Sequence, residues 1–188
     1  MNKIKLKMVR DNLDDLPAYH LPQGYSYRFY QPGDKKHWTE IEHQCGEFSD
    51  KHEASRRFKK EFESYEDEMQ RRCIFLTWKQ SNCPVGTVTA WYGCWGEELY
   101  GRLHFLGIVP EYQGKKLGKP LVNLVMHRLK ELGHEKVYLT TDSSKIVAIK
   151  IYLDFGFVPS MESEESRRGW DMVFSHLEYP VSEALSGD

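Results

Sequence analysis

A short segment rich in lysine and glycine, Pro110 to Lys119, has the residue types that bind phosphate. It follows an apolar run at 103–109 and leads into a helical pattern. A loop that enters a helix exposes backbone N–H groups at the positive end of the helix dipole. Lys115, Lys116 and Lys119 add full positive charges, so the segment suits a phosphate or pyrophosphate.

Spacing excludes two other phosphate-binding loops at this point. A Walker A loop needs four residues between its first glycine and the Gly-Lys pair, followed by Ser or Thr. Here three residues separate Gly114 from Gly118, and Pro120 follows Lys119. The Rossmann G-x-G-x-x-G pattern is also absent from this turn. An ordinary basic turn and an unrelated α/β nucleotide binder remain as alternatives.

Strand and helix patterns alternate around this segment, which indicates an α/β layer structure. Strands are expected at 3–9, 25–30, 73–78, 85–92, 103–109, 136–141, from 157, and at 170–175. Helices are expected from the cap Asp34 through His43, at 53–69, at 118–132, and after Asp142–Ser144. The charged residues of the 53–72 region are expected to face solvent; they include Arg56, Arg57, Lys59, Lys60 and Glu61.

Length and composition narrow the class of protein. The 188 residues suit a single domain over 1–180, with an extension at 1–24 and a flexible tail at 181–188. Apolar residues make up 40% and charged residues 29%, which is typical of a globular chain. The net charge of −2 argues against a nucleic-acid partner. Residues 1–24 are expected to add an edge strand or a dimer contact, and a homodimer is one expected assembly.

The cysteines and the apolar runs indicate the compartment. Cys45, Cys73, Cys83 and Cys94 form no C-x-x-C pair, so neither a disulfide framework nor a metal site is expected. The first residues alternate charge and apolar groups, unlike a signal peptide, and no apolar run is long enough for a membrane span. We therefore expect a cytoplasmic protein with reduced thiols and no membrane partner.

The loop resembles the Q/R-x-x-G-x-G/A loop of the GNAT superfamily of N-acetyltransferases. Gln113 matches its first position, Gly118 its last glycine, and Lys116 stands where the family usually has its first glycine. The run Ala148–Phe157 is similar to the family's A-x-x-x-Y-x-x-x-G-F pattern, with Tyr152 as its tyrosine. The longer run from Thr140 to Pro159 looks like bacterial members of unassigned substrate.

This resemblance implies a fold and a cofactor. The fold is an α/β twisted mixed sheet of six to seven strands, with helices on both faces. Two splayed parallel strands, 103–109 and 136–141, form the cofactor cleft. The cofactor is acetyl-coenzyme A, and the residues implied to bind it are Ile108, Val109, Gln113, Gly114, Lys115, Lys116, Leu117, Gly118 and Lys119.

The resemblance also implies a reaction, transfer of an acetyl group to a primary amine of a small molecule or peptide. Tyr152 is implied as the general acid that protonates the departing thiolate. Arg102 stands where some members have a catalytic Glu, so the resemblance supplies no general base. His104, on the same expected strand, is taken as the candidate base, with Glu97, Glu98 and a water-mediated path as alternatives. No cysteine lies in either motif, which favours direct attack without an acyl-enzyme.

The acceptor and one alternative function stay open. Candidates for the acceptor site, all equally suited to core packing, are Trp38, Cys45, Phe48, Trp91, Trp95 and Trp170. The alternative to an enzyme is a non-catalytic acetyl-coenzyme A sensor or interaction module of the same fold.

Overall fold

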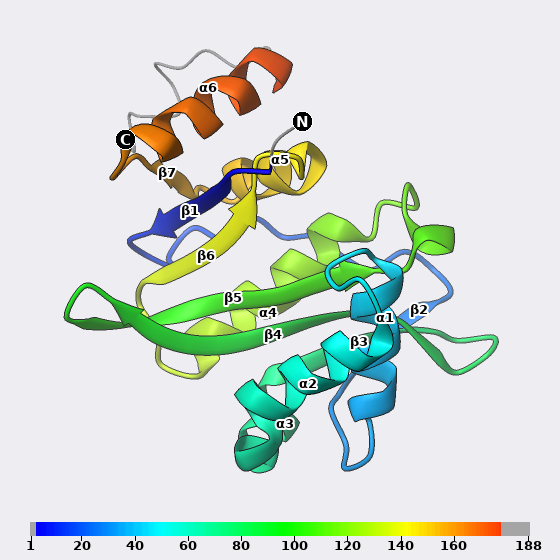
Figure 1. Cartoon of the computed structure of the whole chain (residues 1–188). Helices are drawn as coiled ribbons and strands as arrows, with labels where there is room; N and C mark the ends of the chain where they lie inside the picture. The colour runs from blue at the N-terminus through cyan, green and yellow to red at the C-terminus, as the bar shows by residue number, and fades with distance from the viewer. Residues whose placement is uncertain (1–2, 178–188) are drawn as a thin grey trace. The chain divides into compact units, whose positions relative to one another are not determined.

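A computed structural model describes residues 3–177 of the chain (Figure 1). The strands are β1 (Lys5–Arg10), β2 (Tyr25–Phe29), β3 (Cys73–Trp78), β4 (Cys83–Trp95), β5 (Glu98–Ile108), β6 (Val137–Asp142) and β7 (Val158–Ser160). The helices are α1 (Lys35–Gln44), α2 (Lys51–Phe62), α3 (Glu66–Arg72), α4 (Gly118–Glu131), α5 (Ile146–Asp154) and α6 (Glu164–Leu177). Two 3-10 turns, η1 (Glu63–Tyr65) and η2 (Pro110–Tyr112), complete the elements.

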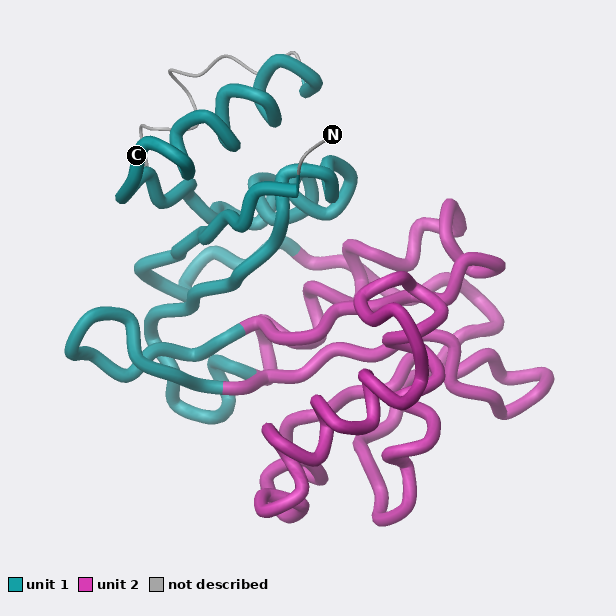
Figure 2. Tube along the Cα trace, viewed as in Figure 1, with its two compact units in different colours: residues 1–17, 92–102, 129–188 teal, residues 18–91, 103–128 magenta. Residues whose placement is uncertain are grey.

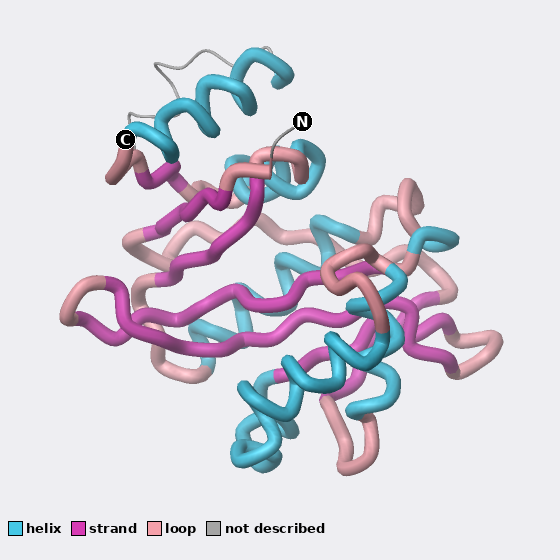
Figure 3. Tube along the Cα trace, in the orientation of Figure 1, coloured by secondary structure: helices cyan, strands magenta, loops and turns pink. Residues whose placement is uncertain are grey.

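The strands follow the order β2-β3-β4-β5-β6-β1-β7 in a seven-stranded sheet (Figure 3). β5 and β6 are neighbours joined through α4, the kind of helical crossover that parallel strands require. The other pairs with a defined register, such as β2 with β3, are antiparallel. The predicted α/β fold with a sheet of six to seven strands is confirmed.

The contacts divide the chain into two compact units (Figure 2). Unit 1 comprises residues 1–17, 92–102 and 129–188, and unit 2 comprises residues 18–91 and 103–128. The prediction of one domain over residues 1–180 stays a prediction. The predicted flexible tail, 181–188, lies outside the described residues.

In unit 1 the N-terminal segment supplies an inner strand. Met8 of β1 pairs with Leu139 of β6 on one side and with Pro159 of β7 on the other. Leu6 and Met8 are fully buried, while Lys5 and Lys7 are exposed, which is the alternation of a half-buried strand. The expected edge strand is therefore wrong for Lys5–Arg10, because neighbours pair with both of its edges.

The strand predicted at 170–175 is also wrong, because these residues lie in α6. Trp170, Val173 and Phe174 are buried, and this i, i+3, i+4 spacing belongs to one face of a helix. The Ser163 hydroxyl accepts the backbone N–H of Ser166 at 3.1 Å and so caps the start of α6. The helical spacing and the cap were both present in the sequence.

In unit 2, α1 and α2 lie in front of the strands and α4 lies behind them in the view of Figure 1. The predicted helix at 53–69 is interrupted, since α2 ends at Phe62 and α3 begins at Glu66. Phe62 and Tyr65 leave helical geometry, with φ of −125° and −130°. The interruption contains no glycine or proline, so the sequence pattern could not locate it.

Asp34 precedes α1 as predicted, but its carboxylate does not cap the helix. It accepts instead from Arg28 Nη2 at 2.9 Å and from the Gln31 N–H at 2.8 Å. Burial alone would raise the pKa of Asp34, but the bonds from Arg28 and Gln31 outweigh it and hold that pKa below its usual value. The Arg28–Asp34 ion pair joins the end of β2 to the start of α1.

We expect Asp34→Asn to lower the free energy of unfolding at neutral pH by about 1–3 kcal/mol, because it leaves the Arg28 guanidinium without its counter-charge. The pKa of Asp34 is lower in the folded protein than in the unfolded chain. The stabilisation is therefore complete above the ordinary pKa of about 4 and is lost as pH falls through the pKa of Asp34 in the folded protein. Urea unfolding from pH 7 to pH 2 measures the gap between the two proteins, which should close below about pH 4. Asp67→Asn, at an exposed position of α3, is the control. A gap that does not change with pH would contradict the assignment.

Candidate active site

The end of β5 and the start of the loop are fixed by short hydrogen bonds within unit 2. The N–H of Val109 donates to the Val85 carbonyl at 3.0 Å, and its carbonyl accepts the Tyr112 N–H at 2.9 Å. The side-chain amide of Gln113 donates to the carbonyl of Ile108 at 2.8 Å. Gln113 therefore ties the loop back to the last residue of β5, and Val109 is already engaged through both of its backbone groups.

Two residues of the loop have left-handed backbone conformations. Gly114 has a φ of +73° and Lys116 a φ of +59°. A side chain in this region costs roughly 1–2 kcal/mol, which is why glycine is favoured there. Lys116 occupies the position of the first glycine in the Q/R-x-x-G-x-G/A pattern. The conformation that glycine favours is thus kept here by a lysine.

Two lysines of the loop lie beside tyrosines, and a buried leucine directly precedes α4. Lys115 Nζ lies 4.5 Å from the centroid of the Tyr112 ring, and Lys119 Nζ lies 3.4 Å from the hydroxyl of Tyr19. Leu117 is buried, and its carbonyl accepts the N–H of Leu121 at 3.1 Å. N–H groups in the first turn of a helix precede the first intrahelical hydrogen bond, so this start of α4 suits an anion.

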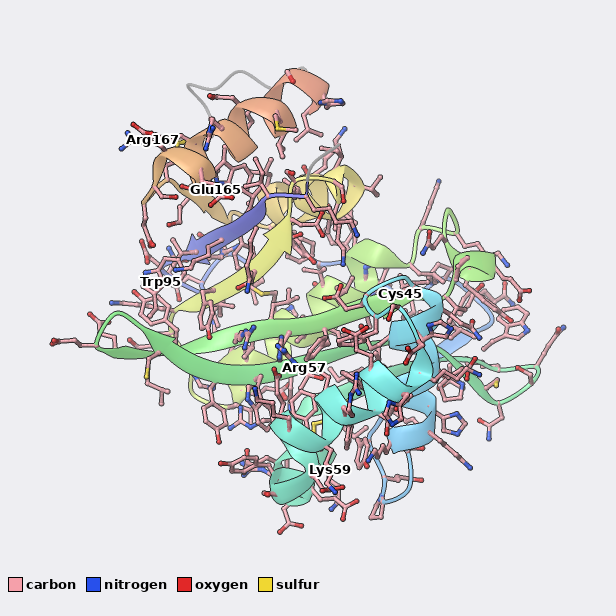
Figure 4. All side chains as sticks on the ribbon, in the orientation of Figure 1. Cys45, Arg57, Lys59, Trp95, Glu165 and Arg167 are labelled. Carbon is pink, nitrogen blue, oxygen red and sulfur yellow. The ribbon has the colours of Figure 1, made fainter. Side chains whose placement is uncertain are left out.

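His104 lies on β5 but is only 6% exposed. Its Nε2 lies 2.6 Å from Oε2 of Glu61 on α2, and Oε1 of Glu61 lies 2.5 Å from Nε of Arg57. Figure 4 labels Arg57 on this helix. The candidate base is therefore part of a His–carboxylate–guanidinium chain. Sequence reasoning missed Glu61, because a carboxylate in a highly charged helix indicates a solvated face.

The backbone of β5 changes direction next to His104. Phe105 has a φ of +49°, rare for a large side chain inside a strand. Leu103 and His104 are both buried, so the alternation of the strand is interrupted there, as at a β-bulge. The Phe105 ring packs 4.9 Å from the Trp38 ring, centroid to centroid. This packing offsets the backbone strain and holds the irregular strand in place.

The carboxylate of Glu42 on α1 and the thiol of Cys45, the residue after that helix, lie against β5. A Cβ at Gly107 would lie 2.8 Å from Cys45 Sγ and 3.0 Å from Glu42 Oε1, so only glycine leaves the two groups room. The Glu42 side chain belongs to a residue that is 1% exposed. Cys45 was among the predicted acceptor candidates, whereas Glu42 was missed. A glycine in the middle of a strand, which signals a close approach, was the available cue.

Tyr152 lies on α5 in unit 1. It is buried, and its ring centroid lies 6.1 Å from that of Phe157. The carbonyl of Tyr152 accepts the N–H of Phe157 at 3.0 Å, which fixes the end of the helix. The structure thus brings the loop, His104 and the end of β5 together in unit 2, whereas Tyr152 belongs to unit 1.

Trp38, Trp91 and Trp170 are buried and pack in the core. All four cysteines are free. Within residues 3–177, no three His, Cys, Asp or Glu side chains are arranged to hold a metal ion. No helix in the same range has the length and apolar character needed to cross a membrane.

Known proteins resemble this chain in sequence and in structure. The model of the acetyltransferase (GNAT) family matches residues 35–157. A mycothiol acetyltransferase of Streptomyces coelicolor is 28% identical over 147 residues, covering 77% of this chain and 46% of the relative. Another, from Stackebrandtia nassauensis, is 36% identical over 62 residues, covering 33% and 20%. The chain therefore spans less than half the length of these relatives.

The solved structures support the same assignment at the level of the fold. A GCN5-related N-acetyltransferase from Sphaerobacter thermophilus superposes with a TM-score of 0.67 at 19% identity. The match covers 84% of this chain and 49% of that one. The family match extends over well more than half of the sequence and contains both motifs singled out in it, up to Phe157. The chain belongs to the acetyltransferase (GNAT) family.

Proposed function

We propose that this chain transfers an acetyl group from acetyl-coenzyme A to a primary amine of a small molecule or peptide. The observation that carries the proposal is the loop between β5 and α4, which keeps left-handed geometry at Gly114 and Lys116. A lysine held in a conformation that favours glycine points to a requirement for this backbone shape. The names of the curated relatives, mycothiol acetyltransferases, favour a small-molecule acceptor.

The residues of the loop fit acetyl-coenzyme A. Backbone N–H groups from Gly114 to Lys119, with three ammonium groups, have the chemistry that a pyrophosphate requires. A carbonyl oxygen has two lone pairs, so Ile108 can accept both the Gln113 amide and a pantetheine amide. We assign the strand-like pairing with the pantetheine amides to the backbone at Ile108 and Val109, whose carbonyl oxygens each have two lone pairs. Bound acetyl-coenzyme A would supply an activated acetyl thioester.

Direct attack requires two proton movements. The amine nitrogen bonds to the carbonyl carbon, the carbon–sulfur bond breaks, and the nitrogen loses a proton while the thiolate gains one. We assign proton donation to the Tyr152 hydroxyl and proton acceptance to His104, oriented by Glu61 at 2.6 Å. Four free cysteines suit a reducing compartment, so we place the reaction in the cytoplasm.

The geometry of the loop predicts that two substitutions at Lys116 differ in their effect on stability. Lys116→Gly should raise the free energy of unfolding by up to about 1 kcal/mol, because glycine adopts the left-handed region without strain. Lys116→Ala keeps the strain and should bring no gain. Both remove an ammonium group, so both should weaken acetyl-coenzyme A binding by about threefold, an effect that added salt reduces. Urea unfolding and calorimetry measure the two properties, and a destabilised Lys116→Gly would contradict the backbone assignment.

The role of Tyr152 predicts a specific kinetic defect. A panel of primary amines is first screened by release of the coenzyme A thiol. With the best acceptor, Tyr152→Phe should lower kcat by about 100-fold or more, with a small change in KM for acetyl-coenzyme A. Tyr65→Phe, at an exposed tyrosine of η1, is the matched control and should behave as the unaltered protein. An unchanged kcat in Tyr152→Phe would show that Tyr152 only packs. Cofactor binding without turnover on any amine would favour the non-catalytic alternative.

A further inference from the structure

Unit 1 contains a cleft of about 350 Å³ whose lining includes none of the residues assigned above to the cofactor or to proton transfer. This volume lies at the lower end of the range for small-molecule sites. The lining residues come from four segments and are Lys7, Cys94, Trp95, Gly96, Tyr138 and Glu162. Trp95, labelled in Figure 4, is at the end of β4, and Glu162 lies between β7 and α6.

Two aromatic rings form the wall of the cleft. The centroids of Trp95 and Tyr138 are 5.5 Å apart, with their planes tilted by 46°. Gly93 allows this arrangement, because a Cβ there would overlap the hydroxyl of Tyr138. The ring of Tyr138 on β6 thus reaches Gly93 on β4, where the absence of a side chain leaves it room. Rings fixed in this way present π-faces that attract cations.

A cation from the chain itself already lies against this wall. Lys7 Nζ is 5.2 Å from the centroid of the Trp95 ring and 3.3 Å from Oε2 of Glu162. The Ser160 hydroxyl donates to Oε1 of Glu162 at 2.9 Å. The hydrogen bonds from Ser160 and Lys7 hold the pKa of Glu162 below its usual value, so this group is an anion at neutral pH. An aromatic face and a carboxylate therefore converge on one ammonium group.

We propose that this cleft binds a small organic cation, an ammonium group on an aromatic or apolar body, which takes the place of the Lys7 ammonium. The Lys7 side chain is 52% exposed, so it can turn into solvent and lose only a weak surface pair. The ligand ammonium then lies between the Trp95 face and the Glu162 carboxylate, and its body packs against Tyr138. The proposal goes beyond acetyl transfer, because binding requires neither cofactor nor turnover.

The charges around the cleft allow an experiment to decide whether its ligand is a cation or an anion. Lys7 and Arg102 are cations, and the Arg102 guanidinium lies 5.6 Å from the centroid of the Tyr138 ring. An anionic ligand would pair with Lys7 and gain from Arg102, whereas a cationic ligand would displace Lys7 and pair with Glu162. The two possibilities predict opposite effects of removing Lys7.

The experiment is calorimetric titration of the full chain, without acetyl-coenzyme A, with three ligands that share one body. The ligands are 2-phenylethylamine, which is cationic at neutral pH, the neutral 2-phenylethanol and the anionic 3-phenylpropanoate. We expect the amine to bind about tenfold more tightly than the other two, because it alone satisfies both Trp95 and Glu162. Absence of saturable amine binding, or tighter binding of either other ligand, would overturn the proposal.

Variants separate a cation site from an apolar pocket. Lys7→Met should tighten amine binding by about threefold, because it removes the internal competitor, and it should leave the alcohol unchanged. Glu162→Gln should weaken amine binding by about fivefold. Glu165→Gln, at an exposed position in the first turn of α6, is the matched control and should have no effect. Weaker amine binding in Lys7→Met, or equal affinities in Glu162→Gln and Glu165→Gln, would overturn the assignment.

Discussion

The loop between β5 and α4 depends on a backbone that turns through the left-handed region at Gly114 and Lys116. This turn aligns the end of the strand with the start of the helix, where N–H groups and lysines converge. Two contacts hold it in place. The Gln113 side-chain amide donates a hydrogen bond to the Ile108 carbonyl, and Leu117, directly before the first turn of α4, is buried. Because the shape is set by backbone geometry, a lysine can occupy a glycine position at a modest cost in strain.

Left-handed backbone geometry held by neighbouring contacts also shapes the adjacent part of β5. Phe105 is held in a left-handed conformation by its packing against Trp38, and Gly107 leaves room for Glu42 of α1 and for Cys45 just after it. As a result, three groups capable of proton chemistry lie along the last part of β5. His104 is on the strand itself, and Glu42 and Cys45 lie beside Gly107. His104 and Glu42 are buried, which makes each a candidate for tuned reactivity, because water does not screen a buried group as it does an exposed one.

Sequence patterns predicted the parts of the fold that local physics determines. The helix expected at 118–132 is α4, Gly118–Glu131, and the loop expected before it follows β5 as predicted. The interruption between Phe62 and Glu66 was missed, since it depends on how Phe62 packs in unit 2. The strand predicted at 170–175 was an error of period, because Trp170, Val173 and Phe174 already had helical spacing. The roles of Glu61 and Glu42 depend on partners more than 40 residues away, which no local pattern contains.

The most direct test of the account is calorimetric titration of the chain with acetyl-coenzyme A, with ATP as the competing nucleotide. We expect saturable binding of acetyl-coenzyme A and weaker binding of ATP. Gly118→Trp should abolish the binding, because the indole would fill the space at the start of α4. His127→Trp, at an exposed position of the same helix, should preserve it, with circular dichroism confirming that both variants fold. No binding by the folded, unaltered chain, or equal binding by Gly118→Trp, would contradict the assignment of this loop as the cofactor site.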